Sequence, residues 1–124
     1  MMFTLALLAM TNAAVADRSA ADRPARDLPV VVSSLTTEQL VELCQGKDAD
    51  PTPSFCSGYI IAEFDTLSLS RQICPSPNRA SNIQVVSAVR KYLRTRAKKA
   101  TGAPTFVVRD ALQQAFPCKR KRSD

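Results

Sequence analysis

Four cysteines are the side chains with the most definite chemistry in this chain: Cys44, Cys56, Cys74 and Cys118. They could hold a metal, form a redox pair or form disulfides. The chain has no histidine, so a zinc site would need all four thiolates, and their spacing contains no C-x-x-C pair. Catalytic redox pairs usually have the C-x-x-C spacing too, at a helix N-terminus, so a redox pair is also disfavoured. We therefore expect no metal and two structural disulfides, which form in an oxidising compartment.

The sequence offers no convincing pair of catalytic groups. Without histidine, a serine or cysteine nucleophile would need a lysine or a carboxylate as its base. Glu63 and Asp65 lie two residues apart on a predicted helix, so they diverge and are expected to be solvated surface acids. The three glycines are scattered, which argues against a phosphate-binding loop. We expect a protein without catalytic activity and without a cofactor.

Capping motifs predict the first two helices that position the cysteines. Thr36 and Gln39 have the spacing of a capping box, and the helix that they open is expected to end before Gly46. Thr52 is expected to cap the second helix, over about residues 53–70, with a proline at its first position. Cys44 then lies at the end of the first helix and Cys56 near the start of the second.

Two further helices follow, and together the four predict an all-α fold. Ser81 and Gln84 form a second capping box, whose helix is expected to run to about Ala100. Pro104 suits the first turn of the fourth helix, which ends before Pro117. Apolar residues at three- and four-residue steps mark the buried faces of the last three helices: Phe55, Cys56, Tyr59, Ile60, Phe64 and Leu67; Val85, Val86, Val89, Tyr92 and Leu93; Val107, Val108, Ala111, Leu112, Ala115 and Phe116. Short connections favour a small up-down four-helix domain.

This topology restricts the disulfide pairing. Cys56 and Cys74 lie at opposite ends of the second helix, roughly 27 Å apart, whereas a disulfide needs alpha carbons within about 7 Å. Alternating helix directions bring Cys44 to Cys56 and Cys74 to Cys118, and we favour these two pairs. The alternative, Cys44 with Cys74 and Cys56 with Cys118, would require a different topology.

The ends of the chain have distinct compositions. The apolar run Phe3–Met10, followed by Ala14-Val15-Ala16, has the pattern of a cleavable signal peptide over residues 1–16, although the first two residues carry no positive charge. The run is too short to span a bilayer, so we expect export without stable membrane insertion. A buried apolar helix is the alternative. Residues 17–34 are expected to form a flexible lead-in, 35–118 the helical domain and 119–124 a basic tail.

Positive charge is concentrated in the second half of the chain. The net charge is +6, and the segment 66–109 contains nine Lys or Arg but no Asp or Glu. The run "RKYLRTRAKK" (90–99) has three interpretations: a solvated face, a docking surface for an acidic partner protein, or a nucleic-acid surface. Nucleic-acid binding fits the charge but not an exported chain, and no aromatic platform for stacked bases interleaves the basic residues, so we expect none.

Five stretches, in this order, resemble the Rap/Tai immunity-protein family: "LCQG", "SFCSGYIIAEFD", "ICPSP", "IQVVSAVRKYL" and "ALQQAFPC". The resemblance covers about residues 37–118. Its most specific elements are Cys-x-x-Tyr, Cys-Pro ahead of a glutamine-containing helix, and the closing Phe-Pro-Cys. Members of that family are small exported helical proteins that protect Gram-negative bacteria against peptidoglycan amidases delivered by type VI secretion. The resemblance places the four cysteines at disulfide positions and Tyr59, Tyr92, Leu93 and Phe116 in the core.

The resemblance implies a periplasmic immunity protein that binds and inhibits a peptidoglycan amidase effector. Such proteins often act as dimers through exposed loops and helix ends, so a homodimer is one expected assembly. We expect contacts in the segments 94–104 and 47–53. The candidate residues are Arg94, Arg96, Lys98, Lys99, Asp48 and Asp50. The alternative function is a non-catalytic periplasmic binding or envelope-stress protein that uses its basic surface on anionic envelope components.

Overall fold

The computed structural model describes residues 29–99 and 102–119. It contains four α-helices, α1 (Thr37–Leu43), α2 (Phe55–Leu69), α3 (Asn82–Arg96) and α4 (Pro104–Ala115), and two short 3-10 helices, η3 (Pro77–Arg79) and η4 (Ala97–Lys99). No strand occurs in these residues, so the predicted all-α fold is confirmed. The predicted signal peptide lies outside the described residues.

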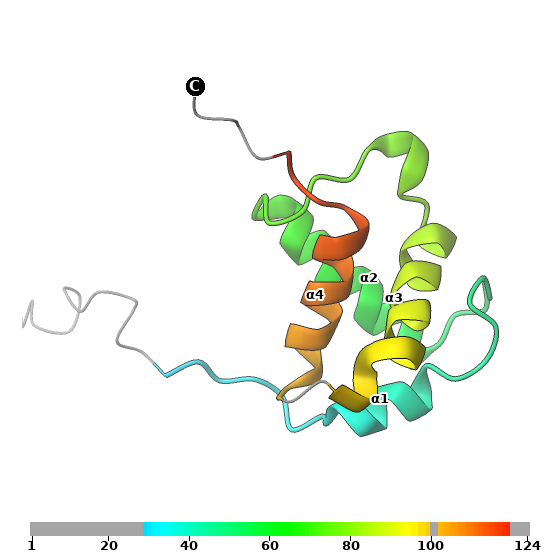
Figure 1. Cartoon of the computed structure of the whole chain (residues 1–124), viewed down its shortest axis with the longest axis vertical. Coiled ribbons are helices and arrows are strands. Elements are labelled where there is room, and N and C mark those ends of the chain that lie inside the picture. The colour runs from blue at the N-terminus through cyan, green and yellow to red at the C-terminus, as the bar shows by residue number, and fades with distance from the viewer. Residues whose placement is uncertain (1–28, 100–101, 120–124) are drawn as a thin grey trace, which may run out of the picture. The chain divides into compact units, whose positions relative to one another are not determined.

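The helices α2, α3 and α4 pack against one another with alternating chain direction, and the short α1 crosses the end at which α4 begins (Figure 1). The apolar faces of all four helices meet in one core, which includes Leu40, Ile60, Val89 and Leu112. None of the helices in the described part of the chain is long and apolar enough to cross a membrane.

Two helix starts follow the predicted capping boxes. The Thr36 hydroxyl accepts the Gln39 N–H at 3.2 Å, and the Gln39 side chain accepts the Thr36 N–H at 2.9 Å. Ser81 and Gln84 make the same reciprocal pair, at 3.3 and 3.0 Å. Each box satisfies N–H groups that have no partner within the helix.

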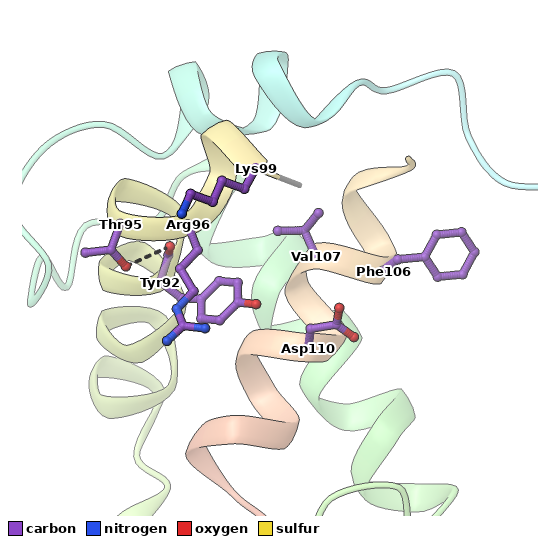
Figure 2. Close-up of a pocket in the computed structure, with 7 residues that line it drawn as sticks. All are labelled: Tyr92, Thr95, Arg96, Lys99, Phe106, Val107 and Asp110. Carbon is purple, nitrogen blue, oxygen red and sulfur yellow. Dashed lines mark hydrogen bonds between the residues drawn. The ribbon is translucent and has the colours of Figure 1, made fainter. Parts of the chain in front are cut away.

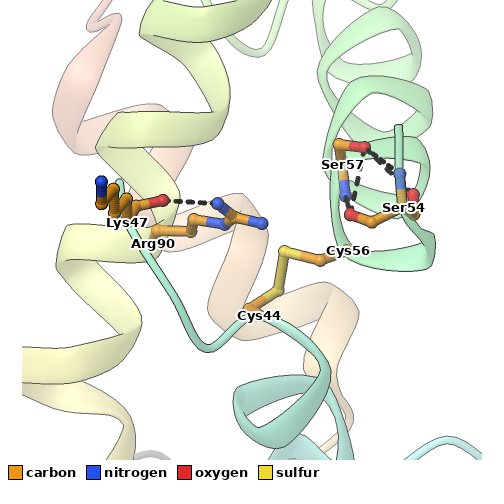
Figure 3. Close-up of a disulfide and its surroundings, with 6 residues drawn as sticks. All are labelled: Cys44, Lys47, Ser54, Cys56, Ser57 and Arg90. Carbon is orange, nitrogen blue, oxygen red and sulfur yellow. Dashed lines mark hydrogen bonds between the residues drawn. A yellow bond between two sulfur atoms is a disulfide. The ribbon is translucent and has the colours of Figure 1, made fainter. Parts of the chain in front are cut away.

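The predicted start of α2 is wrong by two residues. Ser54, not Thr52, is the N-cap: its hydroxyl accepts the Ser57 N–H at 3.1 Å, and the Ser57 hydroxyl accepts the Ser54 N–H at 2.9 Å (Figure 3). Thr52 instead donates its N–H to the Asp50 carboxylate at 2.9 Å, which closes a turn before the helix. The reciprocal serine pair satisfies two backbone donors, and this favours the later start.

The core differs from the predicted apolar faces at three positions. Phe55 is 56% exposed and stacks on the half-buried Tyr59, and Ala115 is exposed. Ile73, which follows α2 in an irregular segment, is buried. Tyr92 is half-buried at the edge of the core, whereas Leu93 and Phe116 are buried as the resemblance implied.

Both favoured disulfides are present. Cys44 and Cys56 join the end of α1 to the start of α2, with alpha carbons 5.0 Å apart (Figure 3). Cys74 and Cys118 join the segments that follow α2 and α4, with alpha carbons 4.8 Å apart. The first pair is buried and the second exposed. One disulfide therefore links chain segments at each end of the bundle.

Candidate partner-binding surface

The structure brings Asp48, from the loop between α1 and α2, to the C-terminal part of α3. Arg94 donates from both terminal nitrogens to the two carboxylate oxygens of Asp48, and its Nη2 lies 2.8 Å from Asp48 Oδ2. Their side chains are 53% and 29% exposed, so water screens the pair. These two predicted contact residues neutralise each other and anchor the loop on α3.

Arg90, one helical turn before Arg94, holds the same loop from inside. It is 4% exposed, and its Nη1 donates to the carbonyl oxygen of Lys47, close to the Cys44–Cys56 disulfide (Figure 3). Its Nε is buried without a hydrogen-bond partner in the described residues. The basic run by itself does not distinguish Arg90 from its basic neighbours, although the four-residue step from Arg90 to Arg94 places both on one face of α3.

Asp50 lies farther along the same loop and is half-buried. The N–H of Thr52 donates to its carboxylate at 2.9 Å, and this hydrogen bond is the main cause that lowers the pKa of Asp50 below its ordinary value of 3.8. The Thr52 side chain and the charges of Arg90 and Lys47 lower the pKa further, whereas desolvation raises it. Asp50 is therefore ionised at neutral pH.

Arg96, Lys98 and Lys99 form a second group at the end of α3 and in η4. All three are exposed, and none forms an ion pair within the described residues. The Arg96 guanidinium lies 5.8 Å from the centre of the Tyr92 ring, a cation–π contact that favours one orientation of the side chain. The three side chains therefore place positive charge on the surface at the end of α3.

The turn that follows these cations is held against α1. The buried Thr37 donates its hydroxyl proton to the carbonyl oxygen of Gly102 at 2.9 Å. Gly102 has a φ of +108°, a conformation that favours glycine. This hydrogen bond fixes one end of the turn between α3 and α4 on the body of the domain.

An open pocket of about 660 Å³ lies beside the exposed cations, between α3 and α4 (Figure 2). Its lining residues are Tyr92, Thr95, Arg96, Lys99, Phe106, Val107 and Asp110. The Tyr92 hydroxyl points toward α4, whereas the Phe106 ring points away from the pocket. Asp110 accepts from the Arg109 guanidinium at 2.9 Å, so the cations dominate the charge of the pocket.

The remaining polar side chains of the described residues include the four cysteines and a small hydrogen-bonded cluster between α2 and α4. Both disulfides are formed, and no group of His, Cys, Asp and Glu in this part of the chain could hold a metal ion. Glu63, expected to be a solvated acid, is half-buried and accepts the Thr105 hydroxyl proton at 2.7 Å. Burial and, to a smaller extent, the charge of Glu63 raise the pKa of the neighbouring Tyr59 above 10.0. This cluster links α2 to α4.

The family model of the Rap1a immunity proteins matches residues 36–118. The chain belongs to the Rap1a immunity protein family. The match begins at Thr36, the N-cap of α1, and ends at Cys118, so it includes all four helices and both disulfides. No curated protein and no solved structure matches the chain significantly.

Membership in the Rap1a family confirms the resemblance and supports an immunity role, which implies binding of a cognate effector. The family match includes the loop held by Arg90 and Arg94 and the exposed group of Arg96, Lys98 and Lys99. Within the part of the chain that matches the family model, two charged segments therefore lie on a helical scaffold that is linked by two disulfides.

Proposed function

We propose that this Rap1a protein acts in the periplasm, where it binds a peptidoglycan amidase effector of type VI secretion and inhibits it. The observation that carries the proposal is the family match together with the exposed group of Arg96, Lys98 and Lys99, which forms no ion pair within the described residues. An immunity protein must recognise its effector, and exposed cations on a rigid scaffold supply such recognition. The inhibitor acts by occupying the substrate cleft, without chemistry of its own.

Export of the chain is part of this proposal. Two disulfides in one small domain suit an oxidising compartment such as the periplasm. The pattern over residues 1–16 supports removal of a signal peptide, which would leave 17–34 as the lead-in to the helical domain 35–118. The segment 119–124 adds a basic tail. A peptidoglycan amidase acts in the same compartment, so inhibitor and enzyme meet there.

We assign direct contact with the effector to the turn after α3 and to the loop between α1 and α2. Arg96, Lys98 and Lys99 are exposed and Asp50 is half-buried, whereas Arg94 and Asp48 contribute by holding the loop in place. Preorganised segments lose little conformational entropy on binding, which raises affinity. A homodimer would present two copies of these segments.

The test is an inhibition assay with purified type VI peptidoglycan amidases and isolated peptidoglycan. We expect the oxidised chain to abolish the hydrolysis by one amidase at about equimolar ratio and to leave unrelated peptidoglycan hydrolases active. The variant Lys98→Glu/Lys99→Glu should retain the helical spectrum and inhibit less strongly. Full hydrolysis by every amidase in the presence of the chain would refute the proposed function.

The exposed cations of α3 and η4 also favour a second candidate, a periplasmic protein that binds anionic envelope components. Such binding is electrostatic and non-specific, so it should weaken strongly as the salt concentration rises. A specific amidase complex has a packed interface and should depend only modestly on salt. Binding to anionic vesicles and to the amidase at 0.05 and 0.5 M salt therefore separates the two candidates.

A further inference from the structure

A groove runs along the contact between α3 and α4, well beyond the turn assigned above. Three pockets, of about 660, 300 and 520 Å³, form it. The 660 and 300 Å³ pockets share Tyr92, Thr95 and Arg96, and the 300 and 520 Å³ pockets share Ala88 and Ala115. We call this continuous depression the α3–α4 groove.

The charge of the α3–α4 groove is strongly asymmetric. Arg79, Lys91, Arg96 and Lys99 line it, and none of them forms an ion pair within the described residues. The one acidic residue in the lining is Asp110, whose carboxylate is bound by Arg109. The helical arrangement therefore separates the cations of α3 into two sets: Arg90 and Arg94 hold the α1–α2 loop, while Lys91 and Arg96 face the groove.

Small side chains form the middle of the groove. Ala88, Ala111 and Ala115 line the pocket that joins the other two. A methyl side chain allows another polypeptide to approach the helices closely, and the flanking cations can then pair with its carboxylates. From Gln84 to Arg96 the groove follows α3 for roughly 18 Å, the length of about six extended residues.

We propose that the α3–α4 groove binds an extended acidic segment of the partner effector, about six residues long, whose carboxylates pair with Arg79, Lys91 and Arg96. This deepens the proposed function and rests on it for the identity of the partner. A nucleic-acid strand fits the groove less well because stacking needs an open aromatic face, whereas Tyr92 is half-buried and lies under Arg96.

The test uses a probe that needs no effector: acetylated hexaglutamate titrated into the oxidised, isotopically labelled chain at 0.15 M salt. We expect saturable amide shifts at Ala88, Thr95, Ala111 and Ala115. Shifts of equal size at Lys47 and Lys119, without saturation in the groove, would mean general counter-ion binding and would overturn the proposal. Tighter binding of a single-stranded DNA octamer than of hexaglutamate would overturn the acidic-peptide assignment.

Matched charge reversals test the contacts. Arg79→Glu/Lys91→Glu changes two exposed groove residues outside the turn and should weaken hexaglutamate binding about five- to tenfold. Arg71→Glu/Lys119→Glu alters the net charge equally at exposed positions that do not line the groove, and should change affinity less than twofold. Equal weakening by both variants would show a long-range field instead of a site.

The two proposals can fail separately. Saturable hexaglutamate binding in the groove by a chain that inhibits no amidase supports the groove and refutes the amidase function. Inhibition of an amidase that Arg79→Glu/Lys91→Glu leaves unchanged supports the function and overturns the groove as the effector contact.

Discussion

Arg90 carries a positive charge into the interior of the domain and ends on a backbone carbonyl rather than a carboxylate. Its neighbour on the same face of α3, Arg94, pairs with Asp48 at the surface. A hydrogen bond from a charged group contributes more than a neutral one, whereas an exposed ion pair contributes little. At the scale of single residues, Arg90 is therefore expected to support the loop between α1 and α2 more strongly than Arg94 does.

Replacing Arg90 tests this ranking. Arg90→Ala removes the hydrogen bond to Lys47 and the buried side-chain stem, so we expect the free energy of unfolding to fall by about 2 kcal/mol. Lys91→Ala, the next residue and exposed, should change it by less than about 0.5 kcal/mol. Urea unfolding of the oxidised variants measures both values. Equal effects would contradict an internal role for Arg90.

Asp50 provides a prediction for pH. The Thr52 N–H stabilises the ionised carboxylate in the folded state, so the folded pKa lies below the unfolded value of about 3.9. The stabilisation is therefore present above that value and is lost as the pH falls through the folded pKa. In an NMR titration we expect the midpoint of the Asp50 carboxyl below 3.8. The difference in the free energy of unfolding between the native chain and Asp50→Asn should vanish at pH values well below the folded pKa of Asp50.

A midpoint at or above 3.8 would show that the turn at Asp50 and Thr52 does not persist in solution. Loop 47–53 would then be mobile rather than preorganised, and its assignment as a contact segment would lose its physical basis.

At the scale of secondary-structure elements, the helix starts reveal what local sequence determines. Thr36 with Gln39 and Ser81 with Gln84 were predictable because a capping box involves residues three apart. The start of α2 was not, because Thr52 and Ser54 flank Pro53 and both can cap. The partner decides: Ser57 completes a reciprocal pair with Ser54, and Thr52 is engaged by Asp50.

The α2 cap gives a direct comparison. Ser54→Ala should lower the free energy of unfolding by about 1 kcal/mol because the Ser57 N–H loses its acceptor. Thr52→Ala keeps the Thr52 backbone N–H and should cost less than about 0.5 kcal/mol. Thermal unfolding monitored by circular dichroism ranks the two. A larger loss of stability for Thr52→Ala than for Ser54→Ala would support Thr52 as the N-cap of α2.

For the molecule as a whole, alternating helices and one distance argument were enough to predict both disulfides. The groove and the internal role of Arg90 were not predictable, because they depend on how α3 packs against α4 and against the α1–α2 loop. Ile73 was missed for the same reason: it lies outside any helical period and is buried only by tertiary packing. Local patterns therefore predicted the scaffold, while the distribution of charge over its surface required the structure.

The disulfides should dominate the stability of this small domain. In the chain-entropy model, closure of the 12-residue loop contributes about 3 kcal/mol and closure of the 44-residue loop about 4 kcal/mol. Because total stability is about 5–15 kcal/mol, reduction of both should unfold much of the domain near room temperature.

The exposed pair can be removed without leaving a cavity in the core. Cys74→Ser/Cys118→Ser should lose about 4 kcal/mol and keep the helical spectrum. Urea unfolding with and without reductant measures this loss. A loss below about 1 kcal/mol would show that packing, not cross-linking, holds the C-terminal end of α4.

The most direct test of the central claim is capture by the tagged, oxidised chain from the periplasm and secreted fraction of its own cells, at 0.15 and 0.5 M salt. We expect one stoichiometric partner that remains bound at both salt concentrations, cleaves isolated peptidoglycan and stops cleaving when the chain is added back. A diffuse set of proteins that is lost at 0.5 M salt, with no peptidoglycan hydrolase among them, would contradict the account.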